Sequence, residues 1–116
     1  MIVTMHVRLV SPSNGHNWLL KVEEGRPITI GRLGAENDIV LSGPTVSRRH
    51  AQIEREGENL ILVDRESTNG IRIRPYGEES EEEVIGRIEI DCGDTFFLGT
   101  VPLQVKAVGL WKEIPL

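Results

Sequence analysis

Residues 60–74 have the sequence LILVDRESTNGIRIR, and this stretch decides the fold class. The four apolar residues at 60–63 predict a strand that is covered on both faces, near the middle of a sheet. The polar residues at 67–70 predict a turn. Isoleucine and arginine then alternate over 71–74, which is the period-two pattern of a half-buried strand. The stretch therefore predicts two strands joined by a turn.

The rest of the chain repeats this pattern of short apolar runs between Gly, Pro, Asn and Ser turns. The further predicted strands are His6–Val10, Trp18–Val22, Pro27–Ile30, Asp38–Leu41, His50–Glu54, Val84–Ile90, Thr95–Leu98 and Val101–Val108. No segment has a helical pattern, because Gly, Pro or turn clusters interrupt every stretch of helical length. We therefore expect an all-β sandwich, with residues 75–83 as its longest polar and most mobile loop.

Length and charge limit the function classes. A chain of 116 residues is expected to form one domain, residues 1–116, with an adequate core. The net charge of −5 argues against a nucleic-acid partner. The absence of a long apolar run argues against a membrane span, and the single Cys92 is typical of a reducing compartment. We therefore expect a cytoplasmic protein without a disulfide.

Three polar stretches contain the groups that bind an anion. They are residues 31–32 (Gly-Arg), 47–50 (Ser-Arg-Arg-His) and 67–70 (Ser-Thr-Asn-Gly). Each stretch lies where the apolar pattern breaks, so each is expected to be a loop or a strand end. Guanidinium groups, hydroxyls and free backbone N–H groups are what a phosphate needs. We expect the three to meet in a phosphate site, with Arg48, Arg49, Arg65, Arg72 and Arg74 around it.

The order and spacing of these motifs resemble the forkhead-associated (FHA) domain. The resemblance rests on residues 31–32, on Ser47-x-x-His50, on Asp64-x-x-Ser67-Thr68-Asn69-Gly70, and on the later pairs Gly93-Asp94 and Leu98-Gly99. Each motif alone is common in loops and turns. Four of them in the same order, in an all-β context, are specific. The resemblance covers residues 18–108, and the first strand also fits.

The resemblance implies a sandwich of about eleven mostly antiparallel strands whose loops at one end bind phosphothreonine peptides. By position, Arg32, Ser47, Arg48 and Thr68 correspond to phosphate-binding residues. Asn69 corresponds to the residue that binds the peptide backbone. The remaining matched positions, which support the site, are Gly31, His50 and Gly70.

The resemblance also implies a phosphothreonine-containing partner protein and an upstream Ser/Thr kinase. We expect a monomer with no enzyme activity, no cofactor and no metal. Two features depart from the family pattern: Ile71 stands where a threonine usually follows Asn-Gly, and residues 78–83 form an acidic run. Either could change how the site is used.

Two other functions compete with phosphopeptide binding. One is an FHA-fold scaffold or oligomerisation domain that binds a partner through a sheet face, independently of phosphate. Leu110 and Trp111 are expected either to cover a sheet edge or to form a contact surface. The other is a hydrolase that uses Ser47, His50 and Asp64. Its weakness is that no Gly-x-Ser-x-Gly motif surrounds the serine.

Overall fold

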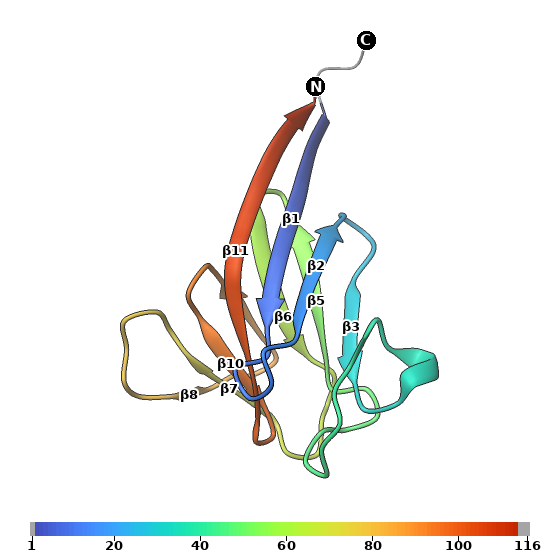
Figure 1. Ribbon diagram of the computed structural model, residues 1–116, viewed down its shortest axis with the longest axis vertical. Helices are drawn as coiled ribbons and strands as arrows, with labels where there is room; N and C mark the ends of the chain where they lie inside the picture. Colours follow the sequence, from blue (N-terminus) through green and yellow to red (C-terminus); the bar gives the residue numbers. More distant parts are fainter. Residues whose placement is uncertain (1, 114–116) are drawn as a thin grey trace.

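The computed structural model describes residues 2–113, which form two β-sheets (Figure 1). The first sheet contains, in spatial order, β2 (Asn17–Val22), β1 (Ile2–Val10), β11 (Val101–Glu113), β10 (Thr95–Leu98), β7 (Ile71–Arg74) and β8 (Glu82–Glu83). The second contains β4 (Ile39–Val40), β3 (Ile28–Gly31), β5 (Ala51–Glu56), β6 (Asn59–Asp64) and β9 (Arg87–Ile90). Only β3 and β4 pair in parallel among these strands. The predicted sandwich of about eleven mostly antiparallel strands is confirmed.

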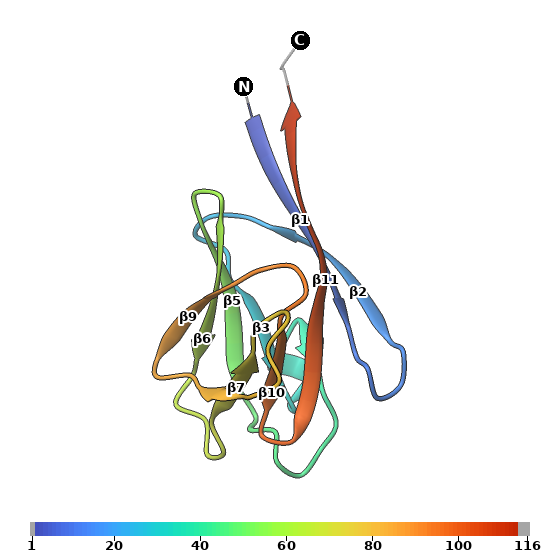
Figure 2. The same cartoon turned by 90° about the vertical axis from the view of Figure 1, so that its left-hand side faces the viewer.

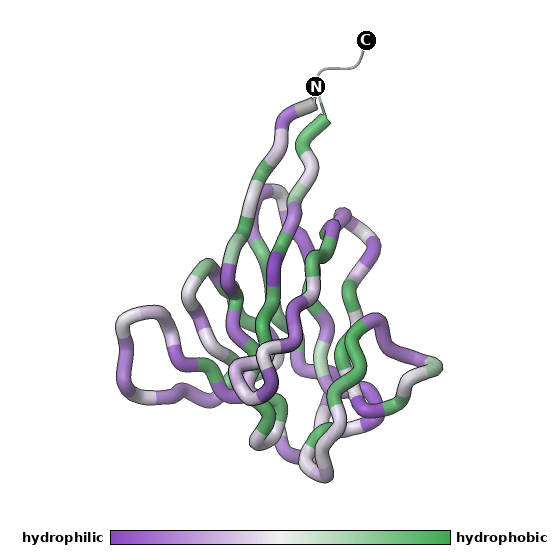
Figure 3. Tube along the Cα trace, in the orientation of Figure 1, coloured by the Kyte–Doolittle hydropathy of each residue, from purple (hydrophilic) through white to green (hydrophobic). Residues whose placement is uncertain are grey.

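The two sheets face each other, as Figure 2 shows. The buried hydrophobic side chains form one core cluster between them. The hydrophobic and hydrophilic residues that alternate along the strands can be followed in Figure 3. In β7, Ile71 and Ile73 are each only 1% exposed, while Arg72 is exposed and Arg74 half-buried. Opposite them in the same sheet, Phe96 of β10 is fully buried. The predicted two-sided pattern of residues 71–74 is confirmed.

Strand β6 lies between β5 and β9 in the five-stranded sheet. Its residues Leu60, Ile61 and Leu62 are all buried, although they point alternately to opposite faces. The apolar run therefore belongs to a strand with neighbours on both sides, as predicted. The predicted cover on both faces is incomplete, because Val63, on the same face as Ile61, is only half-buried.

The prediction of one strand over Val84–Ile90 is wrong. The chain instead forms the short β8 and then β9, with residues 84–86 between them. Gly86 has a φ of +74°, a left-handed conformation that glycine adopts without steric cost. The backbone turns there and passes from one sheet to the other. Val84 is buried, whereas Ile85 is 78% exposed, so the apolar run does not lie on one face.

Strands β1 and β11 are longer than predicted and pair along their whole length. The pairing runs from Ile2 opposite Glu113 to Val10 opposite Gln104, with a bulge beside Arg8. The two strands make a ribbon that carries both ends of the described chain to one pole of the molecule (Figure 1). The β4–β5, β6–β7 and β10–β11 connections lie at the other pole (Figure 1).

The acidic stretch lies at the edge of the six-stranded sheet. Its last residues form β8, in which Glu83 lies opposite Arg72 of β7. The carboxylate of Glu81 is 2.7 Å from Arg72 Nη1. Part of the predicted loop over residues 75–83 is therefore a paired strand. Between residues 2 and 113 no helix is long and apolar enough to cross a membrane.

Candidate functional site

The three polar stretches meet in one pocket of about 590 Å³. It lies at the pole formed by the β4–β5, β6–β7 and β10–β11 connections, which we call the loop pole (Figure 1). The connection after β3, the β4–β5 loop and the β6–β7 loop each contribute side chains to it. The residues that line the pocket are Arg32, Leu33, Glu36, Ser47, Arg48, Arg49, Glu66 and Thr68. All four side chains predicted to bind phosphate therefore lie in the same pocket. Asn69, Gly31, His50 and Gly70 lie beside it and do not line it.

Gly31 is required because two backbone segments approach closely. A Cβ atom built on Gly31 would lie 2.2 Å from the carbonyl oxygen of Arg48. That carbonyl accepts hydrogen bonds from Leu33 N at 3.3 Å and from Asn37 Nδ2 at 2.7 Å. The end of β3 and the β4–β5 loop are thus held in direct contact. This contact places Arg32 and Arg48 on the same pocket.

Arg32 is oriented by the β4–β5 loop. Its backbone N–H donates to Ser47 O at 3.0 Å, and its Nε donates to Val46 O at 3.1 Å. The two Nη atoms make no hydrogen bond to any described residue. A guanidinium that is fixed through Nε and exposed at Nη1 and Nη2 presents a planar pair of donors. Such a pair matches two oxygens of a phosphate.

His50 ties the β4–β5 loop to the β6–β7 loop. Its side chain is fully buried, its Nδ1 accepts from Ser47 N at 3.0 Å, and its Nε2 lies 2.8 Å from Gly70 O. Because a backbone N–H points at Nδ1, the proton of the neutral imidazole is on Nε2, which donates to the Gly70 carbonyl. Gly70 itself has a φ of +72°, which favours glycine.

The side chains of Ser47 and Asn69 each make one hydrogen bond to a described residue and keep one polar group free. Ser47 Oγ accepts from Thr68 N at 3.1 Å, so its own hydroxyl hydrogen remains available. Asn69 Nδ2 donates to Thr45 O at 2.9 Å, which leaves the amide oxygen available as an acceptor. Thr45 in turn is hydrogen-bonded through Oγ1 to Thr100 in the β10–β11 turn. The loops are held in position before any ligand binds.

Arg49 and Glu36 form an ion pair at the rim of the pocket, with Nε and Oε2 2.5 Å apart. The hydrogen bond from Arg49 lowers the pKa of the Glu36 carboxyl below its ordinary value. The same bond raises the pKa of Arg49. Both side chains are exposed, so water screens the pair. The pair offsets the charge of one carboxylate that would otherwise lie next to an anion.

The expectation that five arginines surround the site is wrong for three of them. Arg65 Nη1 donates to Gln52 Oε1 at 2.6 Å and does not line this pocket. Arg72 and Arg74 lie on the outer face of the six-stranded sheet, with their guanidinium carbons 5.3 and 5.5 Å from the ring centre of Phe97. Strand alternation, which sends their side chains outward from β7, explains the difference.

Sequence reasoning missed several residues that shape the site. Asn37 fixes the Arg48 carbonyl and also donates to Leu33 O at 2.8 Å. It follows Gly34–Glu36, a single 3₁₀ turn. Thr45 receives the Asn69 side chain, and Glu66 lines the pocket. The position of Glu66 within the motif Asp64-x-x-Ser67 could have indicated that it lies near the site. Its backbone conformation is visible only in the structure.

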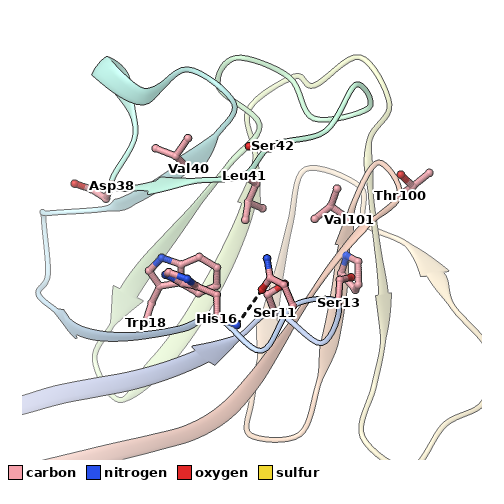
Figure 4. A pocket seen from close by; sticks show the side chains of 12 residues that line it. Ser11, Ser13, His16, Trp18, Asp38, Val40, Leu41, Ser42, Thr100 and Val101 are labelled. Atoms are coloured by element: carbon pink, nitrogen blue, oxygen red, sulfur yellow. Dashed lines mark hydrogen bonds between the residues drawn. The ribbon is translucent and has the colours of Figure 1, made fainter.

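A second hollow, of about 540 Å³, lies between the β1–β2 turn, β4 and the start of β11 (Figure 4). His16 and Trp18 lie against each other at one side, with ring centres 4.6 Å apart, and Val40 and Val101 line other sides. Its lining contains no lysine or arginine, so it does not match an anion. Within residues 2–113 no group of three His, Cys, Asp or Glu side chains could hold a metal ion.

The geometry does not assemble Ser47, His50 and Asp64 as a nucleophile, base and orienting acid. Both ring nitrogens of His50 face backbone groups, and Nδ1 meets the Ser47 N–H instead of its hydroxyl. Asp64 Oδ1 accepts from Ser67 N at 3.1 Å. His50 therefore has no free nitrogen with which to take the Ser47 proton.

Comparison with known proteins places this geometry in a family. A family model described as the FHA domain matches residues 28–99. The transcriptional regulatory protein EmbR of Mycobacterium tuberculosis is 37% identical over 65 residues, which are 56% of this chain and 15% of EmbR. The oxoglutarate dehydrogenase inhibitor of Corynebacterium diphtheriae is 37% identical over 70 residues, which are 60% of this chain and 46% of the inhibitor. The chain thus spans less than half the length of these relatives.

Solved structures agree with the family match. The structure of M. tuberculosis EmbR in complex with a low-affinity phosphopeptide superposes with a TM-score of 0.73 and 27% identity, covering 86% of this chain and 24% of that one. The FhaA FHA domain, solved in complex with the intracellular domain of another protein, gives 0.65 and 27%, covering 90% and 100%. With the family model matched over most of the sandwich, the chain belongs to the FHA domain family.

Proposed function

We propose that this FHA domain is a non-catalytic module that binds phosphothreonine segments of partner proteins. One observation carries the proposal. Three loops that are distant in sequence bring the free Nη atoms of Arg32 and the hydroxyl of Ser47 into one pocket, and His50 holds those loops together. A phosphothreonine brings about −1.5 to −2 charges and three strong acceptor oxygens. The pocket supplies the donors that these oxygens need.

In this proposal Arg32 donates to two phosphate oxygens and Ser47 donates to the third. Arg48 and Thr68, which line the same pocket, add a further cation and a hydroxyl. Hydrogen bonds to charged groups each contribute roughly 1.5–3 kcal/mol, so a few of them separate a phosphorylated from a plain peptide by orders of magnitude. Because the protein has already ordered these groups, its loops lose little conformational entropy when the peptide binds.

Asn69 would hold the peptide backbone. Its Nδ2 donates to Thr45 O, which leaves the amide oxygen available to accept from a peptide N–H in this proposal. The loops that line the pocket lie at the pole opposite the ribbon of β1 and β11 (Figure 1). The EmbR structure, which was solved with a phosphopeptide, supports this use of the fold.

The wider setting follows from the same proposal. A Ser/Thr kinase acts upstream, the partner is a protein that this kinase phosphorylates, and residues 1–116 act as a single, monomeric domain in the cytoplasm. Neither a cofactor nor a metal takes part, since an anion site made of arginine, hydroxyl and amide groups needs none. The kinase adds the phosphate to the partner, and the domain recognises the partner by that phosphate.

The proposal is tested by fluorescence-anisotropy titration with a degenerate peptide library. The central residue is phosphothreonine, phosphoserine or plain threonine. We expect binding to phosphothreonine, at least tenfold weaker binding to plain threonine, and loss of binding in Arg32→Ala. Arg32→Lys keeps the charge without the planar pair of donors, so it should recover only part of the affinity.

The control is Arg26→Ala, which removes the same charge from the exposed β2–β3 turn, away from the pocket. Its affinity should equal that of the wild type. Equal binding of all three peptide pools, or normal binding by a folded Arg32→Ala variant, would contradict the proposal.

A second candidate function is partner binding that does not depend on phosphate. The observation that favours it is an apolar area on the outer face of β2, β1 and β11, where Leu19 is 76% and Trp111 63% exposed. Monomeric proteins rarely leave such side chains together on a surface without a contact to make. A partner that binds equally to the wild type and to Arg32→Ala, and not to Leu19→Ser with Trp111→Ser, would establish this function.

A further inference from the structure

Glu66 is a charged residue in a backbone conformation that side chains disfavour. Its φ of +55° makes it the one non-glycine residue between positions 2 and 113 with a positive φ. The turn around it is closed by Ser67 N, which donates to Asp64 Oδ1, and by Arg65 N, which donates to His50 O. Glycine or asparagine would adopt this conformation at lower cost. The fold therefore gains nothing from a glutamate here.

The strained residue is also the unpaired carboxylate of the pocket. Glu66 lines the pocket beside Arg32, Ser47 and Thr68. The pocket's other carboxylate, Glu36, is paired with Arg49. Glu66, in contrast, forms no ion pair with any residue that the structure describes. Strain that persists at a binding site points from the observed outlier toward function.

We propose that Glu66 makes this pocket selective for phosphothreonine segments that carry a lysine or arginine side chain close to the phosphate. The inference rests on the proposed function and specifies the substrate class of the same site. A lone carboxylate in the pocket that Arg32 lines repels a dianionic phosphate and any acidic residue next to it. A ligand that also brings a cation satisfies Glu66 and removes this repulsion.

The reach of the ligand fits this arrangement. In an extended peptide, side chains two positions apart lie on the same side, about 7 Å from each other. Lysine and arginine have long, flexible stems, so a basic side chain within two positions of the phosphothreonine can reach another point on the rim of the pocket. Glu66 then attracts the basic ligand and disfavours the acidic one, which is how charged residues produce specificity.

The test uses three phosphothreonine peptides that are identical except for two positions on each side of the phosphothreonine, occupied by lysine, alanine or glutamate. Anisotropy titrations are carried out at low and physiological salt with the wild type and with Glu66→Gln. We expect the wild type to prefer the lysine peptide over the glutamate peptide, and the ratio of the two affinities to fall about fivefold in Glu66→Gln.

Two further variants make the result specific to this position. Glu79→Gln removes the same charge from the acidic loop, outside the pocket, and should leave the affinity ratio unchanged. Glu66→Asn suits the left-handed backbone, so it should lose the selectivity while its melting temperature stays the same or rises.

The outcomes separate this inference from the proposed function. If the wild type binds phosphothreonine peptides and the ratio is the same in Glu66→Gln, the inference is overturned and the proposed function stands. If Glu79→Gln changes the ratio as much as Glu66→Gln does, net charge causes the effect and the inference is again overturned. If the wild type binds none of the three peptides, the proposed function fails, and the inference fails with it.

Discussion

The chain uses its arginines in two contrasting regions. At the loop pole, Arg32 and Arg48 line the pocket, and the Nη atoms of Arg32 are left free by the loop that holds its Nε. On the outer face of the six-stranded sheet, Arg72 and Arg74 lie over the ring of Phe97. Arg72 also contacts Glu81 and donates to Gly99 O. A guanidinium whose N–H donors are hydrogen-bonded and whose face covers a ring has few free donors with which to bind an anion.

The difference shows that arginines close to a motif in the sequence do not necessarily line the binding site. Arg72 and Arg74 follow the Asn-Gly turn by only a few residues, yet the strand places them on a different surface. What distinguishes the pocket is the contact between backbone segments that places Arg32 and Arg48 in its lining.

The first prediction concerns the contact that the pocket depends on. Gly31→Ala would place a methyl group 2.2 Å from the Arg48 carbonyl oxygen, a backbone atom that cannot move away as the end of a side chain can. We expect a loss of about 3 kcal/mol in the free energy of unfolding, measured by urea denaturation, with weaker phosphopeptide binding in the folded fraction.

Gly34→Ala is the matched control, because a Cβ on Gly34 meets open space. It should change the free energy of unfolding by less than about 0.5 kcal/mol. If both variants are equally stable, the close approach of the two segments does not hold the pocket together.

The second prediction compares one arginine from each region. Arg48→Ala should weaken phosphothreonine-peptide binding about tenfold, which corresponds to about 1.4 kcal/mol, because it removes a cation from the pocket. Arg72→Ala should leave this affinity within about twofold. Calorimetric titration of both variants provides the measurement. A larger loss in Arg72→Ala would reverse the assignment of the two regions.

The third prediction concerns the sheet face. Phe97→Leu keeps an apolar side chain but removes the ring that Arg72 and Arg74 cover. We expect it to lower the free energy of unfolding by about 1 kcal/mol and to leave phosphopeptide affinity unchanged. A double-mutant cycle with Arg74→Ala should return a coupling energy different from zero, and additive effects would show that the stacking contributes nothing.

The fourth and smallest effect belongs to the rim of the pocket. Because Arg49 lowers the pKa of Glu36, their interaction stabilises the folded state above the ordinary carboxyl pKa and is lost as the pH falls through the lowered value. Arg49→Gln should raise the pKa of Glu36 toward its ordinary value, as followed by NMR of the side-chain carboxyl. An unchanged titration midpoint would mean that the pair does not form in solution.

Much of this architecture could be predicted because local patterns and global fold agree. Alternation in residues 71–74 identified the buried face of β7, and the apolar run at 60–63 identified a strand inside a sheet. The three polar stretches lie together because each interrupts a strand at the same pole. The sequence failed at Val84–Ile90, where a left-handed Gly86 turns the chain between sheets inside an apolar run.

The finer structure of the site depends on contacts that no local pattern encodes. Asn37 donates its side-chain amide to a backbone carbonyl 11 positions away. The backbone carbonyl of Thr45 accepts from a side chain 24 positions away. The strain at Glu66 is a property of its φ angle, which the amino-acid type alone argues against. Long-range hydrogen bonds and a disfavoured backbone angle are therefore what the structure adds to the sequence.

The ribbon of β1 and β11 also determines how this domain can be joined to other modules. It brings residue 2 opposite residue 113 and directs both away from the loop pole (Figure 1). A module fused at either end would be attached by neighbouring points, as on a stalk, with the recognition loops facing outward. Linker length would then set how wide a volume the loops sweep and the effective concentration at which they meet a tethered target.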